Sequence, residues 1–426
     1  MSSDSRFLTW ATAARSPRVS APAADQSSVR TTNLGLVLNA VFAAGGGISR
    51  AEVASITGLT RATVSRLVTD AIEAGLLVEA EPTAPKMGRP STPLFPAART
   101  AVGIGLEVNV DHVAGVAIDL TGAVVDSFAL EGDFADSDPA PVLTQLAQSS
   151  TDLLKRLHAA GVTEIAGISI AIPGVVDVPS GEVVSAPNLG WSGITPADYL
   201  REVFPTGTKL VTHNDADLQA MSAQIALTNG GEHLSSFIYI SGDTGIGGAV
   251  IADGSLLAGE RGWAGEIGHV TIDPNGPPCH CGSRGCLETY AGWRAIAESA
   301  QTDWKLGAGE LLSRLNAGDE RAATAIARAG WALGIAIATA VKLLDIRTIV
   351  LGTSLSALKD QIMPAIMQEL DRRLLAANAS DITVLATQRH DYPAANGGAF
   401  NALRWKLERP EAVGTPLAFD SEINVK

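Results

Sequence analysis

The sequence of 426 residues has few cysteines, few aromatic residues and no long apolar run. Three cysteines, an odd number, argue against the disulfide framework of a small secreted domain. No apolar run reaches the roughly 18 residues that a membrane-spanning helix needs, and the N-terminus lacks the order of residues found in a signal peptide. We therefore expect a cytoplasmic protein without membrane insertion, in which the apolar segment 331–341 is a buried core helix.

Positive charge is also scarce, because 31 lysines and arginines stand against 45 aspartates and glutamates, a net charge of −14. This balance argues against nucleic acid as a partner of the whole surface. The charge is unevenly distributed, however. Residues 1–100 carry 10 basic and 7 acidic side chains, a balance of +3, whereas the remainder carries 21 and 38, a balance of −17. DNA binding is therefore expected only at the N-terminal end.

Apolar residues are plentiful, at 46% of the chain, so a sizeable core is expected in two or three domains. After a first predicted helix at 33–47, two shorter helices are predicted. Ser49 and Glu52 have the spacing of a capping box, which begins the second helix. Gly58 ends that helix and Thr60 caps the third. Two short helices joined by a tight turn with glycine predict a helix-turn-helix.

The third predicted helix, from residue 61, has two different faces. Its apolar residues recur at steps of three and four and are expected to face inward; they are Val64, Leu67, Val68 and Ala71. The positions that a recognition helix would turn toward the DNA bases, with the cap, are Thr60, Arg61, Ala62, Ser65 and Arg66. Arginine suits the guanine edge and serine can serve either base partner. The alternative is a small helical packing module with solvated arginines.

The segment 76–95 is predicted to form two short strands that flank a proline-rich loop, as in the wing of a winged helix. Its tip carries Lys86 and Arg89 within Lys-Met-Gly-Arg-Pro, and an extended tip of this kind can place Arg89 in a minor groove. The alternative is an ordinary basic linker. The helix-turn-helix and the wing together resemble the DNA-binding domain of bacterial winged-helix repressors.

After residue 98 the pattern becomes that of an α/β fold. Residues 101–130 are predicted to form consecutive strands, and 139–161 an amphipathic helix. The segment 235–259 is predicted to be a strand, a glycine-rich turn and another strand, and 347–358 a strand, a glycine and a helix. These alternating elements predict sheets covered by helices.

All three cysteines lie within eight residues, ten residues after a histidine. His269, Cys279, Cys281 and Cys286 supply one imidazole and three thiols, which is the nitrogen and sulfur ligand set that zinc prefers. A closed site of four protein ligands is structural rather than catalytic. A redox pair and unrelated buried cysteines remain as alternatives, since Cys-x-Cys is a less usual metal spacing than Cys-x-x-Cys.

The wider segment 264–292, AGEIGHVTIDPNGPPCHCGSRGCLETYAG, resembles the signature of the ROK family, which groups sugar-responsive repressors with sugar kinases. The elements present are Gly-His, Pro-x-Gly and Cys-x-Cys-Gly-x-x-Gly-Cys-x-Glu. The resemblance covers about residues 100–408, or 31–408 with the winged helix. It implies a fold of two actin-like α/β lobes with a cleft between them, and a structural zinc ion on the histidine and the three cysteines.

The resemblance also implies a sugar site. The positions that it nominates are Gly174, Asn188, Asn214, Asp215, Glu266, His269 and Glu288. Carboxylates and amides suit a sugar because they satisfy rows of hydroxyl donors and acceptors. His269 would bind zinc through one ring nitrogen and offer the other to the sugar. Without the resemblance, Asn214 and Asp215 would indicate only a polar loop or a helix cap.

The first phosphate-binding turn of the family kinases, Asp-x-Gly-Gly-Thr, is altered here. Gly105 stands at the Asp position, Glu107 and Val108 at the glycines and Asn109 at the Thr. A carboxylate in that turn is expected to repel a triphosphate, and a valine to block its close approach. The resemblance therefore predicts no ATP binding through this turn.

The remaining kinase elements are mixed. Asp215 occupies the position of the kinase base, and the second turn, 242–248, is nearly intact. On the adenosine side, Thr353 stands where kinases carry a second glycine. We expect no catalytic residue and no ATP turnover, with a ROK sugar kinase as the alternative. A DNA-binding regulator controlled by a protein partner is a further alternative.

The sequence thus predicts a sugar-responsive transcriptional regulator, most simply a repressor, that binds operator DNA as a homodimer or tetramer. The predicted parts are a disordered tail (1–30), the winged helix-turn-helix (31–96), a first α/β lobe (100–212 and about 396–410), a second lobe with the zinc site (213–395) and a tail (411–426).

Overall fold

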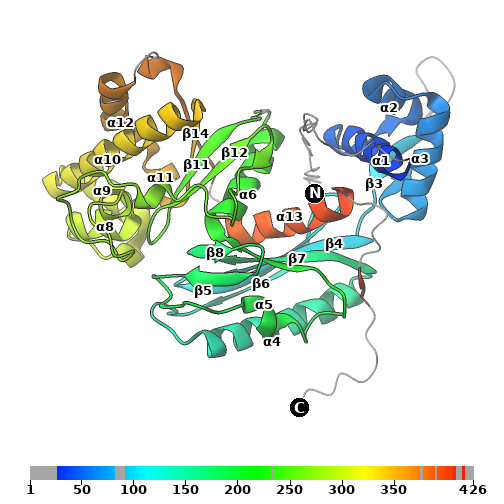
Figure 1. Ribbon diagram of the computed structural model, residues 1–426, viewed down its shortest axis with the longest axis horizontal. Helices are drawn as coiled ribbons and strands as arrows, with labels where there is room; N and C mark the ends of the chain where they lie inside the picture. Colours follow the sequence, from blue (N-terminus) through cyan, green and yellow to red (C-terminus); the bar gives the residue numbers. More distant parts are fainter. Residues whose placement is uncertain are drawn as a thin grey trace.

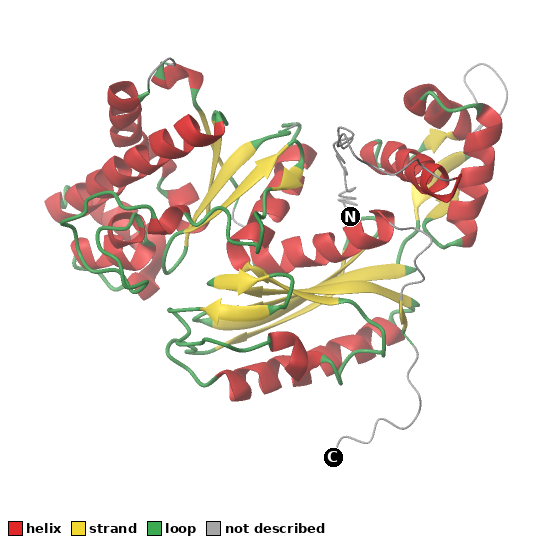
Figure 2. Cartoon of the chain, viewed as in Figure 1, coloured by secondary structure: helices red, strands yellow, loops and turns green. Residues whose placement is uncertain are grey.

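Three bodies make up the chain in the computed structural model: a small N-terminal domain and two α/β lobes (Figures 1 and 2). The structure describes residues 26–81, 92–232, 234–374, 378–388, 391–408 and 415–417. A three-stranded sheet belongs to the N-terminal domain, and larger sheets of six and five strands form the lobes.

The N-terminal domain is a winged helix-turn-helix in its described part. Its elements are α1 (Gln26–Ala43), β1 (Ile48–Ser49), α2 (Arg50–Thr57), α3 (Arg61–Glu73), β2 (Leu77–Glu79) and β3 (Pro93–Pro96). The strands are antiparallel in the order β1-β3-β2. The two strands predicted on either side of the wing loop are therefore present. Lys86 and Arg89 lie outside the described residues.

Local capping chemistry sets the bounds of α2 and α3 as predicted. The Ser49 backbone N–H donates to Glu52 Oε2 at 2.7 Å, and the Glu52 N–H donates to Ser49 Oγ at 3.3 Å. Gly58 ends α2 in the left-handed conformation, with φ of 70°, which glycine adopts without steric cost. The Thr60 hydroxyl accepts a hydrogen bond from the Thr63 N–H at 3.2 Å. The turn between the two helices is thus fixed by side chains within it.

The first helix begins earlier than the sequence indicated. We expected a disordered tail over 1–30, but α1 includes residues 26–30. These first turns lack an apolar stripe, so periodicity gave no signal. Arg30, in this first part of α1, makes an ion pair with α3, in which its Nη2 lies 2.8 Å from Asp70 Oδ2. Residues 1–25 lie outside the described part of the chain.

The first lobe is built on a mixed sheet. Its main strands are β4 (Ala101–Val108), β5 (His112–Asp119), β6 (Val124–Glu131), β7 (Glu164–Ile172) and β10 (Leu210–Asn214), in the order β10-β7-β4-β5-β6. Helix α4 (Pro139–Ala159) packs on one face and α13 (Pro393–Glu408) on the other. The short elements β8 (Val175–Asp177), β9 (Glu182–Ser185) and α5 (Pro196–Leu200) complete this lobe.

Two expected boundaries of this lobe differ from the observed elements. The boundary at 212 falls within β10, and that at 396 falls within α13. The segment 411–426, expected to be a tail, contains β16 (Thr415–Pro416), which pairs antiparallel with β7. The buried side chain of Leu417 joins the core beneath the sheet. A strand of two residues gives too short a pattern to be recognised in a sequence.

Glycines in β4 allow α13 to lie directly on the sheet. A Cβ atom at Gly103 would stand 2.1 Å from the Ala399 carbonyl oxygen, and one at Gly105 would stand 1.7 Å from the Ala395 oxygen. Any larger residue at these positions would therefore push α13 away from the strand.

The second lobe has the strand order β13-β12-β11-β14-β15. These strands are β11 (Phe237–Gly242), β12 (Gly247–Ala252), β13 (Ser255–Leu256), β14 (Thr348–Gly352) and β15 (Thr383–Ala386). Helix α6 (Asp215–Asn229) packs on one face. The other face is covered by α10 (Glu320–Leu344) and α12 (Lys359–Arg373), with contributions from α7 (Glu288–Ala291), α8 (Trp293–Ser299), α9 (Gly307–Asn316) and α11 (Thr353–Ala357).

Helix α10 contains the apolar segment 331–341. The helix has 25 residues, so it is longer than that segment, and its length and composition alone would allow it to cross a membrane. However, 61% of its most apolar window is buried inside the structure. Ala332, Leu333 and Ile337 belong to the core beneath the sheet of the second lobe. The helix is the core helix that the sequence predicted.

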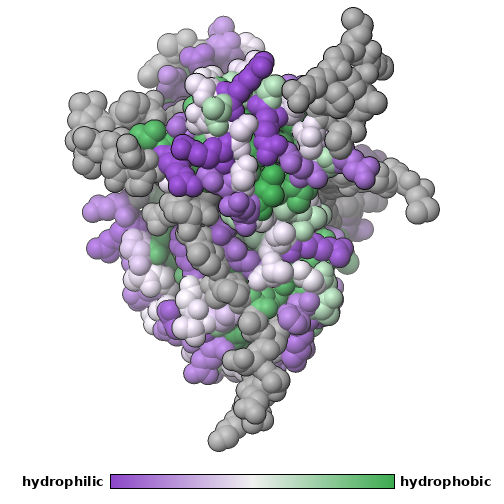
Figure 3. Space-filling model, turned by 90° about the vertical axis from the view of Figure 1, so that its right-hand side faces the viewer, coloured by the Kyte–Doolittle hydropathy of each residue, from purple (hydrophilic) through white to green (hydrophobic). Residues whose placement is uncertain are grey.

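The N-terminal domain shares a hydrophobic core with α13. Leu34 and Leu38 of α1 belong to the same buried cluster as Phe400 and Leu403 of α13. Figure 3 looks at the side of the molecule that carries this domain, where hydrophilic residues surround small hydrophobic areas in the described part of the surface. The DNA-binding fold is thus joined to the first lobe by buried apolar contacts.

Candidate functional site

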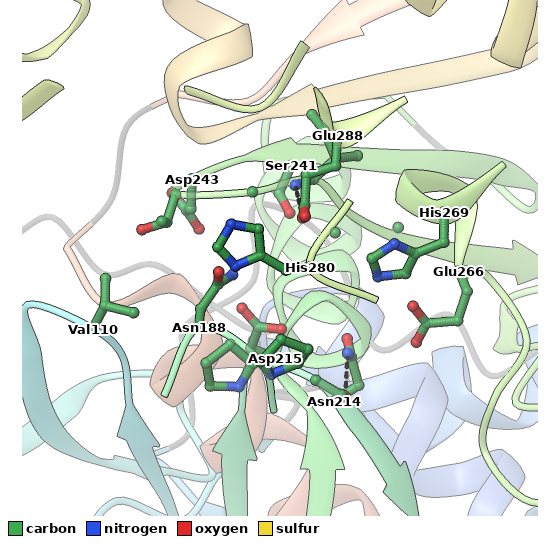
Figure 4. Close-up of a pocket in the computed structure, with 18 of the residues that line it drawn as sticks. Val110, Asn188, Asn214, Asp215, Ser241, Asp243, Glu266, His269, His280 and Glu288 are labelled. Atoms are coloured by element: carbon green, nitrogen blue, oxygen red, sulfur yellow. Dashed lines mark hydrogen bonds between the residues drawn. The ribbon is translucent and has the colours of Figure 1, made fainter. Parts of the chain in front are cut away.

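A pocket lies where the two lobes meet. The first lobe contributes the ends of β4, β7 and β10, and the second lobe contributes the β11–β12 turn and the cysteine loop. All seven residues nominated for the sugar line it; they are Gly174, Asn188, Asn214, Asp215, Glu266, His269 and Glu288 (Figure 4).

Asn214 and Asp215 stand at the junction of β10 and α6. The Asn214 side chain is the N-cap of α6, because its Oδ1 accepts from the N–H groups of Ala216 at 2.8 Å and Asp217 at 3.3 Å. Its Nδ2 donates to the Gly174 carbonyl at 2.8 Å. The helix-cap interpretation and the pocket position are therefore both correct for Asn214. The cap holds the β7 and β10 ends together at the pocket.

Three acidic side chains of the pocket, those of Asp215, Asp243 and Glu266, have a raised pKa. Burial, reinforced by the carboxylates of Asp243 and Glu107, raises the pKa of Asp215 to about 7. Burial also raises the pKa of Asp243 to about 6, although the hydrogen bond from Gln219 opposes the change. The pKa of Glu266 is raised by burial as well. Groups that exchange protons near neutrality can donate to or accept from a ligand hydroxyl.

Glu288 is held by the second glycine-rich turn. Its Oε2 accepts a hydrogen bond from the Ile246 N–H at 3.1 Å. A Cβ atom at Gly245 would stand 2.0 Å from the same oxygen. The turn therefore wraps closely around the Glu288 carboxylate, and glycine at 245 makes this approach possible.

The histidine and the three cysteines meet at one point beside the pocket. The four ligand atoms lie within 4.8 Å of one another, and all three cysteines are free thiols. The Sγ atoms of Cys281 and Cys286 are 3.7 Å apart, and Cys279 Sγ is 3.8 Å from His269 Nδ1. Tetrahedral zinc with Zn–S bonds of about 2.3 Å separates two sulfurs by about 3.8 Å. The cluster could hold a metal ion, and its spacing fits zinc.

The first kinase-like turn differs from its expected arrangement. Glu107 is buried, and its Oε2 accepts from the Ala395 N–H of α13 at 2.9 Å. Its Oε1 lies 3.3 Å from His112 Nε2. Val108 belongs to the core of the first lobe, and neither side chain lines the pocket, whereas Asn109 does. The N-terminus of α13 thus binds the Glu107 carboxylate, and the expected effect of Glu107 and Val108 on a triphosphate stays a prediction.

In the segment expected on the adenosine side, the side chain of Thr353 is hydrogen-bonded to the second glycine-rich turn. Thr353 has φ of 51°, a left-handed conformation that a β-branched residue rarely adopts. Its Oγ1 accepts from the backbone N–H of Gly242 at 2.8 Å. One amide at the start of the second turn thus already has a protein partner.

The predicted recognition helix, α3, has the expected buried and exposed faces. Val64, Leu67, Val68 and Ala71 are buried as predicted. The exposed set is Thr60, Arg61, Ala62, Ser65 and Arg66. These side chains form one basic and small-residue surface around the start of α3.

Some pocket residues were missed by sequence reasoning. His280 and Asp243 line the pocket, and so do Asn109 and Val110. A signal for His280 was available, since a residue between two metal ligands must project from the loop. The others depend on how the two lobes close on each other, which no local pattern records.

Comparison with known proteins agrees with this architecture. The model of the ROK family matches residues 103–404. The chain is 29% identical to the xylose repressor of Bacillus spizizenii, over 82% of this chain and 89% of that protein. It is also 29% identical to the glucokinase of Halalkalibacterium halodurans, over 69% of this chain and 93% of that enzyme.

Among solved structures, the chain is similar to a ROK family transcriptional regulator described as a homolog of the Escherichia coli MLC protein. The TM-score is 0.72 at 24% identity, covering 89% of this chain and 97% of that structure. This likeness supports the fold of the described parts, from the N-terminal domain to the second lobe.

Proposed function

The chain belongs to the ROK family, and from this premise we propose that it is a sugar-responsive transcriptional regulator, acting as a repressor of carbohydrate uptake or catabolism genes in the cytoplasm. One observation carries the proposal. A single chain joins a helix-turn-helix with exposed Arg61 and Arg66 to an interlobe pocket lined by all the residues nominated for a sugar. The similarity to a xylose repressor extends over 82% of the chain, against 69% for a glucokinase.

In this proposal α3 enters the major groove of operator DNA, with its arginines on base edges or phosphates. Lys86 and Arg89 of the wing contact the adjacent backbone or minor groove. Family-like action on two half-sites requires a homodimer or a tetramer.

The sugar hydroxyls would be bound by the amide of Asn188 and the carboxylates of Asp215, Glu266 and Glu288. His269 and the three cysteines would hold a zinc ion, which would cross-link the loop. Glu266 precedes these cysteines in the chain and Glu288 follows them, so the cross-link would fix both carboxylates. His269 directs its second ring nitrogen to the ligand. The metal therefore has a structural task, and the carboxylates do the recognition.

ATP turnover is not part of the proposal, although Asp215 occupies the kinase base position. The close approach of α13 at Gly105 leaves no room for the carboxylate that family kinases carry there. In addition, the Gly242 N–H already donates its hydrogen bond to the Thr353 hydroxyl. Phosphoryl transfer relies on held phosphates and metal ions, so these two changes favour sensing over catalysis.

The test begins with thermal-shift measurements on the full chain with D-xylose, D-glucose, N-acetyl-D-glucosamine, their phosphates and ATP. Duplexes selected from a random pool are then used for DNA retention with and without each hit. We expect a sugar to shift both the melting temperature and DNA retention. The double variant Arg61→Ala/Arg66→Ala should lose DNA retention and keep the sugar shift.

Three results contradict the proposal. ATP-dependent phosphorylation of a sugar, abolished by Asp215→Asn, would establish the kinase alternative. A melting temperature that rises with ATP and with none of the sugars would also favour the kinase alternative. DNA retention that no free sugar alters would identify a regulator controlled by a protein partner.

A further inference from the structure

His280 has a position that the sugar-site residues do not explain. It lies between Cys279 and Cys281, so two neighbouring members of the metal cluster fix its backbone. Its side chain is exposed and lines the pocket. In Figure 4 the imidazole lies between the Asp243 side and the Glu266 side of the pocket, near Asn188 in the view. The cysteine loop thus holds an imidazole over the ligand space.

The hydrogen-bonding capacity of His280 is uncommitted in the described part of the chain. The side-chain amide of Asn214 is already hydrogen-bonded to the Gly174 carbonyl and to the first N–H groups of α6. One oxygen of Glu288 accepts from Ile246. No hydrogen bond to the His280 ring is present among the described residues, so both ring nitrogens are available to a ligand.

We propose that His280 is a specificity-determining contact of the effector, and that it acts with Asp243 to select an uncharged hydroxyl rather than a phosphoryl group at the β11–β12 end of the pocket. The inference rests on the proposed sugar-sensing function and names the ligand class: an unphosphorylated sugar. A hydroxyl there accepts a hydrogen bond from the His280 ring and donates one to the Asp243 carboxylate.

The charges around the pocket favour this class. Four carboxyl groups line it, those of Asp215, Asp243, Glu266 and Glu288, and none of its described lining residues is a lysine or an arginine. A phosphoryl group carries a charge of about −1.5 to −2 at neutral pH. Like charges within a few ångströms of each other repel strongly in a partly buried site. An uncharged hydroxyl avoids this repulsion.

Part of the backbone that could compensate an anion is already bonded within the protein. Glycine-rich turns can bind phosphate through their amides, but two amides of this one already have partners. Gly242 N–H donates to Thr353 Oγ1 at 2.8 Å, and Ile246 N–H donates to Glu288 Oε2 at 3.1 Å. The turn is therefore organised around the protein's own oxygens.

Calorimetric titration of the full, zinc-loaded chain tests the inference. The titrants are D-glucose and N-acetyl-D-glucosamine, their 6-phosphates, and D-xylose. The variants are His280→Ala and His280→Gln, with Arg284→Ala as the matched control, since Arg284 is exposed on the same loop and does not line the pocket. Zinc content and melting temperature are measured for each.

We expect His280→Ala to weaken binding of the active sugar about tenfold, which is the effect of one lost hydrogen bond. His280→Gln should restore part of the affinity, and Arg284→Ala should bind as the wild type does. For a hexose effector, the 6-phosphate should bind the wild type at least tenfold more weakly than the free sugar. Zinc content should stay unchanged in all variants.

The failures are distinguishable. If the wild type binds none of these sugars or phosphates, the proposed function and this inference fall together. If the wild type binds a sugar and His280→Ala binds it equally well with zinc retained, only the role of His280 is overturned. Tighter binding of a 6-phosphate than of its free sugar would overturn the selection of an uncharged hydroxyl.

Discussion

At the scale of single residues, Asp215 makes the strongest energetic prediction. Its folded-state pKa is raised to about 7 by burial and by neighbouring carboxylates. The folded chain therefore holds a proton that the unfolded chain loses above about pH 4, and the free energy of unfolding falls as pH rises between these values. Asp215→Asn removes this cost, so it should stabilise the protein by about 2 kcal/mol more at pH 8 than at pH 5.

Urea denaturation of both proteins at the two pH values measures the difference. Asp371→Asn on α12 is the control, because Asp371 is exposed. A gain from Asp215→Asn that is the same at both pH values would contradict the account of a buried, protonated carboxyl.

The residues of the pocket illustrate how far a sequence can predict a site. The signature at 264–292 nominated Glu266, His269 and Glu288, and the fold brings them into one pocket with Asn214. The direction of the Glu107 side chain could not be predicted. Its hydrogen-bond partner, Ala395, is 288 residues away in the chain, and only the packing of α13 decides which face of β4 the carboxylate occupies.

At the scale of elements, the bounds of helices could be predicted where side chains within the same turn set them, but not where a distant part of the chain does. Caps at Ser49 and Thr60 fixed the bounds of α2 and α3, because each cap is satisfied within three residues. By contrast, Arg30 at the start of α1 pairs with Asp70 of another helix, and β16 pairs with an edge offered by β7. Elements held by distant partners leave no periodic signal of their own.

The cysteine loop is the element whose prediction can be tested most directly. Cys281→Ser removes one of the four proposed zinc ligands, so the loop carrying Glu266 and Glu288 should lose its closure. We expect a lower melting temperature, less than one zinc per chain and no response to sugar. DNA retention without sugar should persist, because the core that the N-terminal domain shares with α13 contains no residue of the cysteine loop.

Zinc analysis, thermal melts and DNA retention on the full chain check this expectation, and a strong chelator on the wild type should reproduce it. A Cys281→Ser protein that senses sugar normally would show that the metal cluster does not hold the pocket.

At the scale of the whole molecule, α13 connects the pocket with the DNA-binding domain. Its N-terminal end binds Glu107, which lies near the end of β4 that leads into the pocket. Its later turns share a core with α1. It also packs against α6, which begins at Asp215 in the pocket. A Cβ atom at Gly397 would stand 1.8 Å from the Leu218 carbonyl of α6, so these two helices are in backbone contact. This is a continuous packed path between the two sites.

A ligand alters DNA binding only by its differential affinity for two states, and we expect such states to differ at the α6–α13 contact. Gly397→Ala should force the helices apart and reduce the coupling free energy between sugar and DNA by about 0.5–2 kcal/mol. The measurement is the ratio of DNA affinities with and without saturating sugar. Gly35→Ala on α1, where an added Cβ meets nothing within 4 Å, is the control. If the folded Gly397→Ala protein keeps the wild-type ratio, the signal does not pass through this contact.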